Sequence, residues 1–96
     1  MDKDKYRKAV AEYVSVLSQS ARDTHQAEDR IKYQHHLAEA ARMFVAIEKN
    51  GSIQELKQLV GDQRHSYGWD YLAGPAGDAA EAAFNAFANL VETANE

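Results

Sequence analysis

The stretch that decides the fold is residues 78–94, DAAEAAFNAFANLVETA. Asp78 is followed three residues later by Glu81, which is the spacing of a capping box that opens a helix. The side chains after it are mostly apolar, and four of the five polar ones form one narrow line at Glu81, Asn85, Asn89 and Glu92, with Thr93 as the fifth. A helix that is apolar over most of its circumference is buried on most sides. The stretch therefore predicts a C-terminal helix, residues 78–94, with more than one neighbour.

The rest of the chain has the composition of an ordinary globular protein. Its 96 residues are 45% hydrophobic and 27% charged, which suits a single domain, residues 1–96, with one modest core. Cysteine is absent, so disulfides and thiolate sites are excluded. The charged start, residues 1–5, is unlike a secretory signal, and no window approaches the roughly 18 apolar residues of a membrane span. We expect a cytoplasmic protein that makes no membrane contact.

Two further helices are expected to form an antiparallel hairpin, because apolar residues recur every three or four positions in both segments. The first spans about residues 3–21, and its apolar face consists of Tyr6, Val10, Tyr13, Leu17 and Ala21. The second reaches Lys49, and its face consists of Tyr33, Leu37, Ala40, Phe44 and Ile47. The period is lost in residues 18–25, where Asp23 or Thr24 could cap the second helix. A turn is expected there, and a kinked continuation is the alternative.

A short third helix is expected between two glycines. Gly51 provides the left-handed residue that ends the second helix. Ser52 and Glu55 then form a capping box that opens the third helix. This helix runs through Val60 and ends at Gly61.

Residues 61–77 form the main loop, because they hold four of the five glycines and the only proline. Pro75 offers an alternative, earlier start for the C-terminal helix, since proline suits a first helical turn. The predicted fold is an all-α bundle of three long helices and one short helix. In it, the C-terminal helix packs into the groove of the helical hairpin.

The densest group of chemically distinctive side chains lies in the main loop. Its members are Arg64, His65, Tyr67, Trp69, Asp70 and Tyr71. Arginine and aromatic residues are enriched at interface hot spots, and the same side chains could stack on a nucleotide. Equally, Trp69 and Tyr71 could fold inward with Leu72 and plug the bundle. The sequence alone therefore allows two interpretations of this loop: it forms a binding surface, or its aromatic residues pack into the core.

Acidic charge is concentrated in the C-terminal third of the chain. All eleven Lys and Arg lie in residues 1–65, whereas residues 66–96 hold five Asp and Glu. This distribution disfavours direct nucleic-acid binding, which requires a basic surface. It suits a basic partner, although a solvated acidic tail has the same composition.

Self-association is a further expectation. The C-terminal helix has a wide apolar surface, and Ile31, Ala38 and Val45 repeat every seven residues opposite the main face of the second helix. Exposed apolar surface usually marks an interaction site. We therefore expect a homo-oligomer or a stable complex.

Catalytic and metal sites are not indicated. Among the four histidines, His35 shares a helix face with Glu39 at the i, i+4 spacing that two ligands would need, but no third ligand is evident. No serine lies in a nucleophile motif. We predict no enzyme activity, no metal site and no cofactor.

The sequence thus favours a small protein–protein interaction module of inhibitor or adaptor type. It would bind a larger protein, whose identity the sequence does not reveal, through residues 64–71 and the acidic C-terminal third. The alternative is a small-ligand or nucleotide-binding protein that uses Arg64, Tyr67, Trp69 and Tyr71. Trp69 distinguishes the two, because the fluorescence of this single tryptophan would respond to a bound small molecule.

Overall fold

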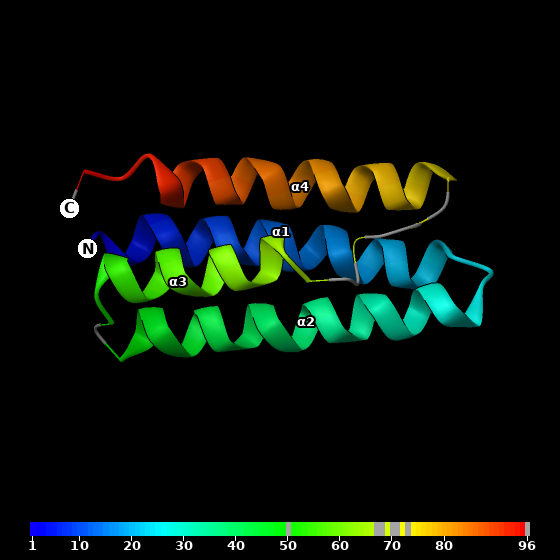
Figure 1. Ribbon diagram of the computed structural model, residues 1–96, viewed down its shortest axis with the longest axis horizontal. Helices are drawn as coiled ribbons and strands as arrows, with labels where there is room; N and C mark the ends of the chain where they lie inside the picture. The colour runs from blue at the N-terminus through cyan, green and yellow to red at the C-terminus, as the bar shows by residue number, and fades with distance from the viewer. Residues whose placement is uncertain (50, 67–68, 70–71, 73, 96) are drawn as a thin grey trace.

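Four helices make up the computed structural model, which describes residues 1–49, 51–66, 69, 72 and 74–95. They are α1 (Lys3–Asp23), α2 (Ala27–Glu48), α3 (Ile53–Arg64) and α4 (Gly74–Glu92), and no strand occurs within those ranges. Successive helices run antiparallel, and both chain ends lie at the same end of the bundle (Figure 1). The predicted all-α bundle with one short helix is confirmed.

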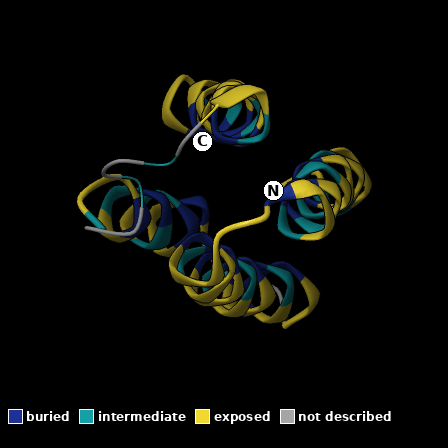
Figure 2. Cartoon of the chain, turned by 90° about the vertical axis from the view of Figure 1, so that its right-hand side faces the viewer, coloured by how far each residue is buried: buried dark blue, intermediate teal, exposed yellow. Residues whose placement is uncertain are grey.

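The helices occupy the four corners of the bundle when it is viewed along its axis (Figure 2). α1 packs against α2 and α4, and α3 packs against the same two helices from the other side. α2 and α4 therefore lie at opposite corners. The prediction that the C-terminal helix fills the groove of the α1–α2 hairpin is wrong, because α3 folds back between α2 and α4.

The apolar face of α1 is buried as predicted, with Tyr6, Val10, Tyr13 and Leu17 in the core. The buried face of α2 is rotated from the predicted one. Leu37 and Phe44 are only half-buried, whereas His36 and Met43 are fully buried. The reason is that α2 is covered by α3 as well as by α1.

A turn, and not a kink, joins α1 to α2. Thr24 ends α1: its N–H donates to the Ser20 carbonyl at 3.0 Å, and its hydroxyl accepts from the Gln26 N–H at 3.3 Å. The prediction that Asp23 or Thr24 caps α2 is wrong, since the N-cap is Gln26, which makes no side-chain capping bond. Asp23 still belongs to α1, where it accepts from the Gln19 amide at 2.8 Å.

Gly51 is required because a side chain would not fit at this position, and not because the backbone adopts a left-handed conformation. Among the described glycines, only Gly74 has a positive φ, 70°, so the predicted left-handed Gly51 is wrong. A Cβ on Gly51 would lie 2.4 Å from the carbonyl oxygen of Ala46, which accepts the Gly51 N–H at 2.7 Å. This close approach fixes the corner between α2 and α3.

α3 begins as predicted but does not end at Gly61. The Ser52 hydroxyl accepts from the Glu55 N–H at 3.1 Å, which confirms the N-cap. The helix continues through Gly61 to Arg64. A glycine inside a helix costs only about 1 kcal/mol, and the hydrogen bond from the Gln63 amide to the Tyr13 hydroxyl helps to hold the helical turn beyond it.

α4 begins at Gly74, four residues before the predicted Asp78 start, and Pro75 lies in its first turn, in agreement with the alternative start. Its core face is Ala80, Phe84, Phe87, Ala88 and Val91. Ala79, Ala82 and Ala86 are exposed. Within one chain, α4 is therefore covered on one side and not on most sides.

Two glycine substitutions should have opposite effects on stability. Gly51→Ala forces its Cβ against the backbone of Ala46 and should lower the free energy of unfolding by more than about 1 kcal/mol. Gly61→Ala meets no atom within 4 Å and should raise that free energy by about 0.5–1 kcal/mol. Urea unfolding followed by circular dichroism measures both; equal effects would contradict the close approach at Gly51.

Candidate functional site

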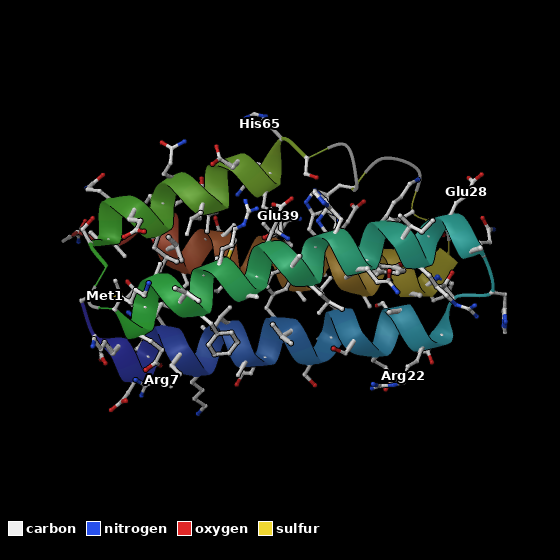
Figure 3. All side chains as sticks on the ribbon, turned by 90° about the horizontal axis from the view of Figure 1, so that it is seen from below. Met1, Arg7, Arg22, Glu28, Glu39 and His65 are labelled. Atoms are coloured by element: carbon white, nitrogen blue, oxygen red, sulfur yellow. The ribbon has the colours of Figure 1, made fainter. Side chains whose placement is uncertain are left out.

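The structure places three of the six predicted site residues. Arg64 is the last residue of α3, His65 is its C-cap, and Trp69 lies in the connection to α4. His65 is exposed and lies at the end of α3 (Figure 3). The other three predicted residues, Tyr67, Asp70 and Tyr71, lie outside the described residues.

Trp69 is packed against the core beyond the end of α3. Its ring stacks on the His36 ring with centroids 3.7 Å apart and an interplanar angle of 16°. The Phe84 ring lies 4.9 Å away, and the indole N–H donates to the Gln63 carbonyl at 2.9 Å. Trp69 is nevertheless only half-buried, so one part of the ring plugs the bundle and another part reaches the surface.

A buried polar network lies beneath Trp69. The amide nitrogen of Gln63 donates to the Tyr13 hydroxyl at 2.7 Å and lies 3.2 Å from Nδ1 of His36 and 3.3 Å from the His36 carbonyl oxygen. Gln63 and His36 are completely buried, and Tyr13 is nearly so. The network therefore connects α1, α2 and α3 inside the core.

Sequence reasoning missed Gln63 and Tyr13 as members of this network. The available signal was the position of Gln63, three residues after Val60 and seven after Leu56, on the apolar face of α3. A polar residue on such a face is buried and needs hydrogen-bond partners. Tyr13 was recognised only as a core residue, because periodicity reveals burial and not the partner of a hydroxyl.

Ionisation inside the network is suppressed. Burial, reinforced by the carboxylate of Glu39, raises the pKa of Tyr13, so this phenol stays neutral. Burial also raises the pKa of Glu39, although His35 and Arg42 oppose the shift. The Nε2 atom of His35 lies 2.5 Å from the Glu39 carboxylate. Burial therefore keeps the Tyr13 hydroxyl protonated within the network.

A small cavity opens beside Trp69 on the α3–α4 side of the bundle. Its volume is about 210 Å³, and it is lined by Arg64, Trp69, Glu81, Phe84 and Asn85. The guanidinium of Arg64 pairs with the Glu92 carboxylate and lies 5.4 Å from the centroid of the Phe84 ring. Of the three predicted residues that the structure describes, Arg64 and Trp69 therefore line one cavity, whereas His65 does not.

The described residues that line the cavity bring guanidinium, carboxylate, amide and aromatic groups together. No group of three potential metal ligands occurs in the part of the chain that the structure describes. A wider depression of about 730 Å³ lies at the N-terminal end of α4, and its described lining contains none of Arg64, His65 and Trp69.

Comparison with protein-family models, with curated proteins and with solved structures finds no match to this chain. Of the helices described, none combines the length and apolarity that a bilayer span requires. The side chains themselves are therefore the basis for inferring a function.

Trp69 should contribute far more to stability than Arg64. Trp69→Ala removes a ring packed on His36 and Phe84 and should lower the free energy of unfolding by about 3 kcal/mol. Arg64→Ala breaks a half-exposed ion pair and should cost less than about 1 kcal/mol. Chemical denaturation checks both, and a Trp69→Ala protein as stable as the parent would contradict the packed position.

Glu39→Gln should change how stability depends on pH. Because folding raises the pKa of Glu39, its stabilising contribution is present below the ordinary pKa of glutamate and is lost as pH rises through the raised value. The amide of the variant has no proton to lose, so the variant should gain stability relative to the parent between about pH 4 and neutrality. Urea titrations across that range measure the free energy of unfolding of both proteins. If these free energies changed with pH in parallel, the effect of burial on Glu39 would be contradicted.

Proposed function

We propose that this chain is a small protein–protein interaction module of inhibitor or adaptor type. It binds a larger protein through the α3–α4 edge, which we define as Arg64, Trp69, Glu81 and Asn85 together with the connection that precedes α4. The observation that carries the proposal is the cavity of about 210 Å³ at this edge. It is bordered by Trp69, whose ring is held in place by its contacts with His36 and Gln63.

Preorganisation is the first argument for this function. Trp69 is held by its stack on His36 and by its bond to the Gln63 carbonyl. A partner that contacts its exposed part would not need to immobilise it, which removes one of the entropic costs of association. Trp and Arg are also the residue types most enriched at hot spots.

The charge of the edge indicates the kind of partner. Asp78 and Glu81 are exposed on α4, which carries no Lys or Arg. The single cation of the edge, Arg64, is already paired with Glu92. A basic patch on the partner protein would complement this surface and accelerate the encounter.

The size of the cavity favours a protein partner over a small ligand. Pockets for drug-sized ligands usually have volumes of about 300–1,000 Å³, whereas this one has about 210 Å³. A nucleotide would also have to compete with Glu92 for Arg64 and with His36 for a face of Trp69. One side chain of a partner protein fits these limits better.

Reversing one charge at the edge tests the proposal. Glu81→Lys should reduce recovery of the bound protein from extracts of the source cells at least tenfold, about 1.4 kcal/mol, because it places a cation against a basic partner. Glu12→Lys makes the same charge change at an exposed site on α1 and should have no effect.

Two results would count against an interaction function at this edge. One is equal recovery by the Glu81→Lys and Glu12→Lys proteins. The other is a saturable change in Trp69 fluorescence on titration with nucleotides, which would support the small-ligand alternative. Trp69→Ala is unsuitable as the test variant, because loss of its core contacts would change stability together with binding.

A further inference from the structure

The outward side of α2 carries an exposed line of mostly apolar residues. α2 lies between α1 and α3 in Figure 3, with its outward side toward the viewer. The line, which we call the α2 stripe, consists of Ala27, Ile31, Gln34, Ala38, Ala41 and Val45. Ile31 is 66% exposed and Val45 50% exposed, and Met1 is the only other large apolar side chain that is exposed among the described residues.

A depression of about 500 Å³ lies beside Val45, between α2 and α3. Its lining combines apolar residues, among them Ala41 and Leu59, with the charged residues Arg42, Lys49 and Glu55. Half-buried Leu37 and Phe44 also lie on α2. The α2 stripe is therefore a narrow apolar line with charged residues beside it.

We propose that the α2 stripe binds the α2 stripe of a second copy of this chain, antiparallel, about a two-fold axis that passes at Ala38. Ile31 lies seven residues before Ala38 and Val45 seven residues after it. In a two-fold antiparallel pair, a residue before the axis faces the residue equally far beyond it in the other copy. Ile31 of each copy thus faces Val45 of the other, and the small Ala38 side chains allow close approach at the centre.

Charge supports the antiparallel direction. Glu28, His35, Arg42 and Lys49 repeat every seven residues along one flank of the stripe, and all are exposed. Glu28 lies ten residues before Ala38 and Lys49 eleven after it, so an antiparallel pair places each Glu28 near the other copy's Lys49. A parallel pair would instead bring the two Lys49 residues to the same end. Antiparallel helix dipoles are favourable as well.

The middle of this flank is compatible with the same arrangement. His35 of one copy would lie near Arg42 of the other. Within each copy, however, the Glu39 carboxylate is 2.5 Å from His35 and interacts with Arg42, so a negative charge accompanies both groups. The like-charge cost at this position is thereby reduced.

The size of the face predicts a dissociable dimer. α2 has 22 residues, a length of about 33 Å at 1.5 Å per residue. A single helix face of that length covers less area than the roughly 800 Å² per partner of a standard interface. We expect a dissociation constant in the micromolar range or weaker. α4 lies at the opposite corner of the bundle, so dimerisation leaves the α3–α4 edge accessible and is independent of the proposed function (Figure 2).

Single cysteines test both the pairing and its direction, because the chain contains no cysteine of its own. Ala38→Cys should form an intermolecular disulfide rapidly on mild oxidation, since this bond requires Cα atoms about 4.4–6.8 Å apart. A mixture of Ile31→Cys and Val45→Cys chains should give the mixed dimer at least tenfold faster than either symmetric dimer. Ala82→Cys, exposed on α4, is the matched control and should react slowly.

Equilibrium sedimentation of the full-length chain provides a second measurement. Ala38→Glu places two carboxylates at the axis and should raise the dissociation constant at least tenfold, whereas Ala82→Glu should leave it unchanged. Glu28→Lys alone should weaken the dimer, and the double variant Glu28→Lys/Lys49→Glu should restore it.

Three outcomes would overturn the proposal. A parent chain that remains monomeric up to about 1 mM, a concentration at which even a dimer held by only about 4 kcal/mol would be populated, would exclude the dimer. Faster formation of the symmetric Ile31→Cys dimer than of the mixed dimer would establish a parallel pair. Equal reactivity of Ala38→Cys and Ala82→Cys would show that α2 meets another copy only by random collision.

Discussion

The buried amide of Gln63 joins three helices at the level where α3 ends. Its nitrogen reaches the Tyr13 hydroxyl on α1 and the ring and carbonyl of His36 on α2, while its own backbone carbonyl accepts the indole N–H of Trp69. Removing one partner of such a network leaves another polar group buried and unsatisfied, which costs about 1–3 kcal/mol. The length of α3, the orientation of His36 and the position of Trp69 are therefore set together.

The short α3 creates the site. It has 12 residues, whereas α1 has 21 and α2 has 22, so it covers only part of their length. Trp69 covers His36 beyond the end of α3, and its remaining surface borders the cavity shared with Glu81 and Asn85. Trp69 thus packs on the core with one part of its ring and keeps another part exposed beside the cavity.

Sequence patterns predicted the parts of the fold that depend on apolar periodicity, and they failed where one side chain has two roles. The α1 face was correct because its residues point into a core formed on one side. Gly61 resembles a helix end, but Gln63 beyond it has partners on two other helices, and these contacts are invisible in the local sequence. Gly51 was correctly placed at the corner, although the reason is the nearby Ala46 carbonyl. Arg64 and Trp69 line the same cavity, whereas their contacts with Glu92 and His36 depend on tertiary structure.

The opposite placement of α2 and α4 has a consequence for valency. Two copies joined through α2 would carry their α3–α4 edges on the outer sides of the pair, related by the two-fold axis (Figure 2). A partner with two matching sites, or one arranged as a symmetric assembly, would then be held at both edges. The second contact would form at the high effective concentration set by the first, so a weak single edge could give tight binding without any additional contact.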